Sequence, residues 1–291
     1  MLTRIDHVMI CVPDLDQGVG AYARIGFDIR PGGVHPGKGT HNAIAFNEDD
    51  YLELLAIRDR DEYLAGSAFG ELAGFIERGG GLRYIVLQSD DLAADVAAMR
   101  ARGVDVGEPV RGERTTPAGT VLRWQAAMLG ARNALPLFFI QHLTPLEVRR
   151  AQARGTDGHP NQVLRAERVY IAVPDLAPAV EAWRKVLGMP APKVERGTVI
   201  NADMAVFNIG PTGLTLAQPA APGAAAEALA RRGPGPFQVL YRTRSMDAAS
   251  RWMAEHGVPP PARGIRNTGE QAMLVGPEYA CGVSIGFVGP A

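Results

Sequence analysis

The strongest constraint on this chain is a recurring corner. Val12-Pro13-Asp14-Leu15 returns letter for letter as Val173-Pro174-Asp175-Leu176, and two looser versions are Ser89-Asp90-Asp91-Leu92 and Arg244-Ser245-Met246-Asp247. Each corner follows a short apolar run. The stretch after each corner is amphipathic and ends at a glycine 11 or 12 residues later. Because glycine commonly ends a helix, each stretch is predicted to be helical. A fourfold internal repeat of strand, corner and helix therefore organises the chain.

Short strand-like runs divided by turn residues follow each predicted helix; in the first repeat they are Phe27–Arg30, His41–Phe46 and Tyr51–Ile57. Each repeat thus reads β-α-β-β-β. One such unit has a sheet with a bare apolar face, which it must bury against a partner unit. We predict an α+β fold in which four βαβββ units pair into two cup-shaped domains. Consecutive pairing is the simple assumption, and pairing of unit one with unit four stays open.

A charged and then loop-like segment separates the two pairs of units. The predicted organisation is a first domain, a linker and a second domain: residues 1–142 (units 1–57 and 79–142, joined by a helix over 59–78), 143–166 and 167–291.

Composition excludes several classes of protein. With 46% hydrophobic and 21% charged residues, the chain belongs with soluble globular proteins. A formal net charge of -1 gives no electrostatic reason to expect nucleic acid or an anionic membrane as partner. No apolar run approaches the roughly 20 residues that span a bilayer, and no signal-peptide pattern is present. Cys11 and Cys281 lack a CxxC partner, so we expect a reducing cytoplasm.

Two polar residues stand out inside apolar strands. Strand alternation places His7 on one face with Met9 and Cys11, and it places Asp6 on the other face with Val8 and Ile10. Glu53 lies within Leu52-Glu53-Leu54-Leu55, where a buried charge needs a partner. From the residues alone, a structural pairing of Glu53 with an arginine or with His7 is the plainer interpretation.

Repeated βαβββ units with a histidine in the first strand and a glutamate in the last resemble the vicinal oxygen chelate superfamily, which includes glyoxalase I, bleomycin-resistance proteins and extradiol dioxygenases. More narrowly, the chain resembles glyoxalase-like domain proteins with four units. The resemblance covers nearly the whole chain, and the matching stretches are Ile5-Asp6-His7-Val8, Gly39-Thr40-His41-Asn42, Tyr51-Leu52-Glu53-Leu54-Leu55, Gly81–Leu92, His159-Pro160-Asn161 and Ala280-Cys281-Gly282-Val283.

The resemblance implies that paired sheets form cups into which metal ligands project. It makes His7 and Glu53 candidate ligands of a divalent Zn, Ni, Fe or Mn ion, whose presence stays open. The other units keep fewer ligands. Tyr84, Arg168 and Gln238 occupy the position of His7, and the position of Glu53 corresponds to Phe139, Thr215 and Gly286. At most one cup retains a metal pair, and the second domain is predicted to be degenerate.

Five further residues are candidates for contact with a substrate: His41, Asn42, Tyr84, Trp124 and Gln238. For His41 and Asn42, a plain hydrogen-bonding role at a strand start is the alternative. His142 could reach the rim of a cup, and His159 lies in a predicted loop. No residue is assigned a catalytic role.

Two functions follow from this pattern. The first is a metal-dependent lyase, isomerase or dioxygenase acting on a small oxygenated molecule in the cup of the first domain. The alternative is a metal-free small-molecule binding or sequestering protein of the bleomycin-resistance type. The expected partner in both is a small molecule, without nucleic acid or membrane, and a homodimer stays open.

Overall fold

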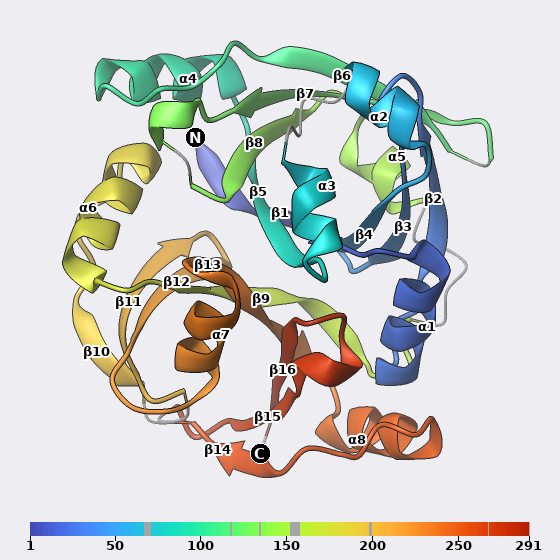
Figure 1. The fold of residues 1–291 in the computed structure, drawn as a ribbon, viewed down its shortest axis with the longest axis vertical. Coiled ribbons are helices and arrows are strands. Elements are labelled where there is room, and N and C mark those ends of the chain that lie inside the picture. Colours follow the sequence, from blue (N-terminus) through green and yellow to red (C-terminus); the bar gives the residue numbers. More distant parts are fainter. Residues whose placement is uncertain are drawn as a thin grey trace.

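Two curled eight-stranded sheets form the framework of the molecule (Figure 1). The computed structural model describes residues 1–66, 71–116, 118–133, 135–151, 158–197, 200–266 and 268–290. The first sheet has the order β2-β3-β4-β1-β5-β8-β7-β6, and its strands are β1 (Leu2–Cys11), β2 (Arg30–His35), β3 (Thr40–Phe46), β4 (Tyr51–Ile57), β5 (Gly81–Ser89), β6 (Val110–Thr115), β7 (Val121–Met128) and β8 (Leu137–His142).

The second sheet repeats this order as β10-β11-β12-β9-β13-β16-β15-β14. Its strands are β9 (Val163–Ala172), β10 (Val194–Gly197), β11 (Ala202–Ile209), β12 (Thr212–Pro219), β13 (Gly235–Thr243), β14 (Arg263–Ile265), β15 (Gln271–Val275) and β16 (Ser284–Gly289). The predicted α+β architecture of paired βαβββ units is confirmed. Unit one pairs with unit two through β1 and β5, and unit three pairs with unit four through β9 and β13. The alternative pairing of units one and four is therefore wrong.

The repeated corners are helix N-caps. The side chains of Asp14, Asp91, Asp175 and Ser245 each accept a hydrogen bond from a backbone N–H of the following first turn, which satisfies a donor that the helix itself leaves free. The four unit helices that begin there are α1 (Leu15–Ile25), α4 (Leu92–Ala101), α6 (Leu176–Leu187) and α8 (Met246–Glu255).

Helices between the units differ from the sequence prediction. The segment predicted as one helix over 59–78 contains α2 (Arg60–Gly66) and α3 (Leu72–Glu77), and residues 67–70 lie outside the described part. Within the predicted linker 143–166 lie α5 (Leu146–Arg150) and the start of β9, while residues 152–157 are not described. The domain limits stay a prediction.

A helix that the sequence analysis did not predict, α7 (Ala224–Arg232), packs on the concave face of the second sheet (Figure 1). Two short 3-10 turns, η1 (Ala131–Asn133) and η2 (Pro277–Tyr279), complete the described helical segments. None of the described helices combines the length and the apolar character needed to cross a membrane.

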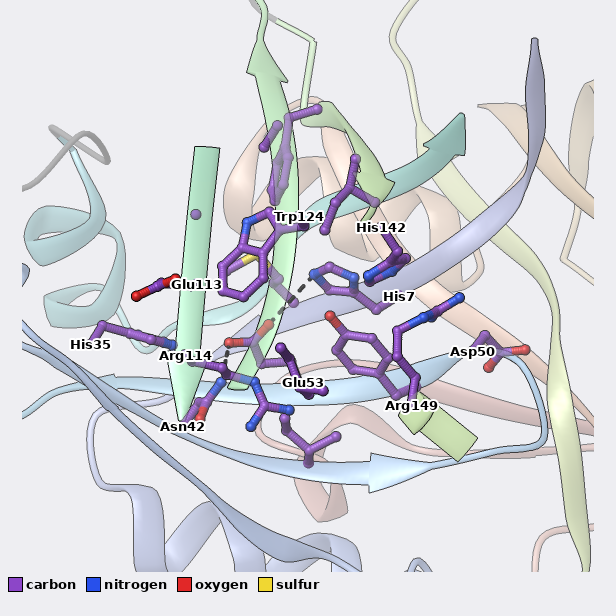
Figure 2. A pocket seen from close by; sticks show the side chains of 18 of the residues that line it. His7, His35, Asn42, Asp50, Glu53, Glu113, Arg114, Trp124, His142 and Arg149 are labelled. Carbon is purple, nitrogen blue, oxygen red and sulfur yellow. Dashed lines mark hydrogen bonds and ion pairs between the residues drawn. The ribbon is translucent and has the colours of Figure 1, made fainter. Parts of the chain in front are cut away.

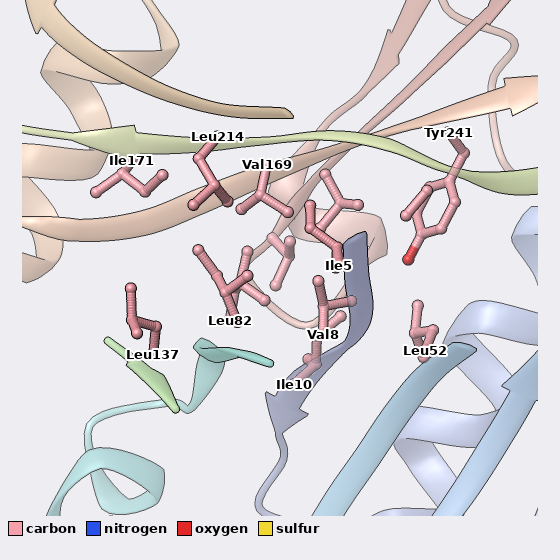
Figure 3. Close-up of a cluster of buried hydrophobic side chains, with 14 of the residues drawn as sticks. Ile5, Val8, Ile10, Leu52, Leu82, Leu137, Val169, Ile171, Leu214 and Tyr241 are labelled. Carbon is pink, nitrogen blue, oxygen red and sulfur yellow. The ribbon is translucent and has the colours of Figure 1, made fainter. Parts of the chain in front are cut away.

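The main core lies between the two sheets. Ile5, Val8 and Ile10 of β1 face Val169 and Leu214 of the second sheet (Figure 3). Ile5 and Val8 reach the same side although they are three residues apart, because the pairing of β1 with β5 shifts register between Ile5 and His7. This irregularity adds a residue to the strand. The prediction that Asp6 shares the face of Val8 and Ile10 is wrong for this reason.

The segment around His159 anchors the second half of the chain on the first. His159 Nδ1 accepts a hydrogen bond from the backbone N–H of Asp28 at 3.0 Å, and its Nε2 lies 2.9 Å from Asn47 Oδ1. Since Nδ1 accepts, Nε2 carries the proton and the ring is neutral. Burial lowers the pKa of His159 to about 4, so protonation of the ring opposes folding.

We predict that His159→Gln makes stability less dependent on pH. An unfolded histidine titrates near 6.5 and folded His159 near 4, so the wild type loses up to about 3 kcal/mol of unfolding free energy from this group as pH falls through that window. The variant lacks this loss. Urea unfolding of both proteins across the window measures the difference, and a difference independent of pH contradicts the prediction. Burial raises the pKa of nearby Asp50 to about 7; this carboxyl is present in both proteins, so its contribution largely cancels in the difference.

Candidate functional site

The concave face of the first sheet encloses a cavity of about 650 Å³ (Figure 2). Strands from both units line it, together with α5. The walls are largely apolar and aromatic, which suits a small organic ligand; they include Met9, Ile44, Phe46, Tyr51, Leu55, Leu122, Trp124, Met128, Phe138 and Ile140.

His7 and Glu53 meet at the wall of this cavity. Nε2 of His7 lies 3.5 Å from Oε2 of Glu53, and both side chains are more than nine-tenths buried. The His7 ring stacks on Tyr51, with 4.2 Å between the ring centroids, and the edge contact with Phe138 is 6.1 Å. Asn42 Nδ2 donates to Glu53 Oε1 at 2.7 Å. The resemblance made these two residues candidate ligands of one ion, with an arginine as the alternative partner of Glu53, and the fold places His7 and Glu53 in contact.

Asp6 is a part of this site that the sequence analysis assigned to the opposite face. Its carboxylate is fully buried and lies 2.7 Å from His7 Nδ1 and 2.7 Å from His142 Nε2. Burial alone would raise the pKa of Asp6, but the two imidazoles outweigh it and hold the pKa far below its usual range. An ionised Asp6 accepts hydrogen bonds only, so each histidine donates to it.

The contact of His7 Nδ1 with Asp6 determines which nitrogen of His7 faces Glu53. Because His7 donates through Nδ1, its Nε2 turns toward the Glu53 carboxylate and the cavity. A lone pair and a carboxylate repel each other at such a distance unless a proton or a cation lies between them. The pair is therefore suited to exchange a proton with a bound molecule or to share a cation.

The donors match a metal site in kind but not in number. A carboxylate behind a ligating imidazole is the usual outer partner of a metal-bound histidine. However, the described part of the chain contains no group of three or more His, Cys, Asp or Glu side chains that could hold an ion, and catalytic zinc sites have three protein ligands. The described residues do not form a complete metal site.

The register of the strands explains why a further metal-ligating side chain is lacking at the equivalent position of the second unit. Glu53 pairs with Met9, and the matching pair in the second unit joins Val86 to Phe138. The counterpart of Glu53 is thus Phe138, and the alignment with Phe139 is wrong by one residue. Phe139 instead lies in the core between the sheets. An aromatic ring occupies a position where the resemblance implies a ligand.

Of the five residues predicted to contact a substrate, two line the cavity and three do not. Asn42 and Trp124 line the cavity, whereas His41, Tyr84 and Gln238 are not among its lining residues. Tyr84 packs its ring against Phe138 at 5.9 Å and against the Arg83 guanidinium at 4.7 Å. Gln238 lies in β13 of the other sheet.

Two arginines that the sequence analysis did not single out add positive charge to the cavity. Arg149 comes from α5, its Nε is buried without a hydrogen-bond partner among the described residues, and burial lowers the pKa of its guanidinium. Arg114 of β6 also lines the cavity (Figure 2). Its Nη1 donates to Gly32 O at 3.3 Å. Nothing in the local sequence pattern indicated that residues of the predicted linker close the cup.

The equivalent positions of the second sheet have other side chains. Register places Arg168, Thr215, Gln238 and Gly286 where the first sheet has His7, Glu53, Tyr84 and Phe138. Around them α7 contributes Ala225 and Ala228 to an apolar cluster on the concave face of the sheet. The same scaffold therefore carries a lined cavity in one sheet and a packed helix in the other.

Comparisons with known proteins agree with this architecture. A family model for the glyoxalase-like domain matches residues 5–187, and a model for the glyoxalase/bleomycin resistance protein/dioxygenase superfamily matches residues 167–275. The fold and its paired units thus define a member of that superfamily. Within it, the chain belongs to the glyoxalase-like domain family.

Solved structures show the same fold at low identity. A hypothetical protein from Staphylococcus aureus aligns with a TM-score of 0.70 and 17% identity over 98% of this chain and 99% of that one. A mutant of 4-hydroxymandelate synthase from Streptomyces coelicolor aligns with a TM-score of 0.66 and 14% identity over 99% and 92%. No curated protein matches this sequence.

We predict that Asp6→Asn lowers the unfolding free energy by about 2 to 4 kcal/mol near neutral pH, because the buried His7 and the partly buried His142 lose their anionic acceptor. The folded pKa of Asp6 is depressed from 3.8, so this contribution is present above that value and is lost as pH falls below it. Urea unfolding from neutral to acidic pH measures the penalty, which should shrink in acid.

The matched control is Asp105→Asn, which removes a surface carboxylate paired with Arg132 and should change stability little. Equal effects of the two substitutions would show that Asp6 contributes no more than a surface charge.

Proposed function

We propose that this protein is an enzyme that moves a proton on a small molecule bound in the cavity of the first sheet, as in isomerase or lyase chemistry. The single observation that carries the proposal is the contact of His7 Nε2 with Glu53 Oε2 at the cavity wall, with Asp6 behind His7. A carboxylate that orients one ring nitrogen leaves the other to act as a general base.

The residues present support one sequence of events. His7 Nε2 takes a proton from a carbon next to a carbonyl group, and the electron pair of that C–H bond moves onto the carbonyl oxygen. Asp6 and Glu53 lie on either side of the ring and stabilise the imidazolium that forms. His7 then returns the proton to the isomerised carbon framework, so that no oxidant or reductant is consumed.

The cavity favours a substrate with an apolar body and an anionic group. Its aromatic and aliphatic walls would bury the body. The partly buried Arg149, with an unpartnered Nε, and Arg114 offer guanidinium donors to a carboxylate and to the oxyanion formed during proton transfer.

A metal-dependent form of the proposal places a divalent ion on His7 and Glu53, where it would polarise substrate oxygens. Imidazole and carboxylate suit Zn, Ni, Fe or Mn, and the position of Asp6 behind His7 favours it. Two protein donors fall short of a complete site, and the acid–base steps above use protein side chains alone. Metal-free sequestering of a ligand is the second candidate function, and it is favoured by the same shortage of donors.

We predict that small carboxylic acids with an apolar body and a carbonyl-activated C–H bind the wild type and incorporate solvent deuterium at that carbon. His7→Gln should slow the exchange by about 100-fold or more, because it removes the base, while binding persists. Thermal shift identifies the ligands and proton NMR in D₂O follows the exchange. His256→Gln, in an exposed histidine at the end of α8, is the control. Binding without exchange in the wild type would assign sequestering instead.

A second measurement separates the metal-dependent form. Under the acid–base proposal, EDTA leaves deuterium exchange unchanged and elemental analysis finds no stoichiometric metal that depends on His7. One metal ion per chain in the wild type that is absent from His7→Ala, together with loss of exchange in EDTA, would replace the acid–base proposal with the metal-dependent one.

A further inference from the structure

A second and much smaller cavity, of about 110 Å³, lies between the two halves of the molecule. One wall comes from α3, β5 and the approach to β8, and the facing wall comes from the end of α7 and the start of β13. Three arginines line it, Arg83 from the first half and Arg231 with Arg232 from the second. No aspartate or glutamate is among its described lining residues.

Arg83 presents donors to this space. The flat face of its guanidinium lies over the rings of Phe75 and Tyr84, at 5.4 Å and 4.7 Å from their centroids. Stacking occupies the face of the group but leaves its N–H donors at the edge. Its Nε is buried and has no hydrogen-bond partner among the described residues. With no carboxylate among the described lining residues, the positive charge of Arg83 has no counter-ion in this cavity.

Arg232 is held in place by the backbone around it. Nη1 donates to Gly282 O at 2.8 Å, and the guanidinium fills the space that a side chain at Gly81 or Gly282 would occupy. Burial lowers the pKa of Arg232, and the neighbouring positive charge of Arg231 lowers it further. Arg232 is thus partly desolvated, and the exposed Arg231 adds a second positive charge beside it.

The dipole of α7 explains the positions of only two of the three arginines. Arginines in the last turn of a helix interact favourably with its dipole, and Arg231 and Arg232 lie in the last turn of α7. Arg83 belongs to β5, on the other side of the cavity. The helix dipole of α7 therefore does not explain why Arg83 lines this cavity.

We propose that this cavity binds a tetrahedral oxyanion, either inorganic phosphate or the phosphoryl group of a small molecule. Guanidinium donors match phosphate oxygens in charge and in geometry. The volume holds such a group but not a ligand of the size that the first-sheet cavity accepts. An anion here joins β5 to α7 and so stabilises the contact between the halves. This site is independent of the function proposed above.

The test measures binding of inorganic phosphate and of glycerol 3-phosphate to the full-length protein by isothermal titration calorimetry, with sodium chloride holding the ionic strength constant. The variants are Arg83→Gln and Arg231→Gln. Arg251→Gln removes the same charge from an exposed position of α8, and Arg149→Gln removes the unpartnered guanidinium of the first-sheet cavity.

We expect saturable binding of one anion per chain, weakened about tenfold or more by each of Arg83→Gln and Arg231→Gln, and unchanged in the two control variants. Tighter binding of glycerol 3-phosphate than of phosphate assigns an organic phosphate as the ligand, and the reverse order assigns the free ion.

Unsaturable binding, or an equal loss in Arg251→Gln, overturns the proposal. Loss of binding in Arg149→Gln alone overturns it as well, because the anion would then occupy the first-sheet cavity. If Arg83→Gln does not fold, Arg231→Gln carries the test, since the Arg231 side chain is exposed.

Discussion

The structure depends on strand β1, whose side chains pack into the core between the sheets on one face and line the cavity of the first sheet on the other. Ile5, Val8 and Ile10 pack against the second sheet, while His7, Met9 and Cys11 turn toward the concave side of the first. An extra residue at Asp6 makes both arrangements compatible. It keeps the apolar side chains in register with the inter-sheet core and releases the Asp6 carboxylate toward the two histidines.

A buried carboxylate requires partners, and that requirement organises the site. Asp6 stays ionised because His7 and His142 both donate to it, and the bond from Nδ1 decides which nitrogen of His7 faces Glu53. Asn42 orients Glu53 in the same way. Hydrogen bonds with Asp6 and Asn42 thus fix the positions of His7 and Glu53, the two residues on which the proposed proton transfer depends.

The two sheets show how one scaffold serves different purposes. Both have the same strand order and the same capped helices. In the first sheet, α5 brings Arg149 to an open cavity; in the second, α7 packs on the concave face and carries Arg231 and Arg232 toward the first half. The differences between the two concave faces arise in the segments between units, which the repeat does not constrain.

The sequence by itself determined the four βαβββ units and their helix caps, because these follow from local periodicity and repeated corners. It limited the partner of Glu53 to His7 or an arginine, because a buried charge needs a partner. Only the tertiary structure decided the contact of Asp6 with His7 and His142, the placement of Phe138 instead of Phe139 at the position equivalent to Glu53, and the approach of Arg149 to the cavity. A register shift of one residue changes which face a side chain takes, and contacts between distant segments leave no periodic trace in the sequence.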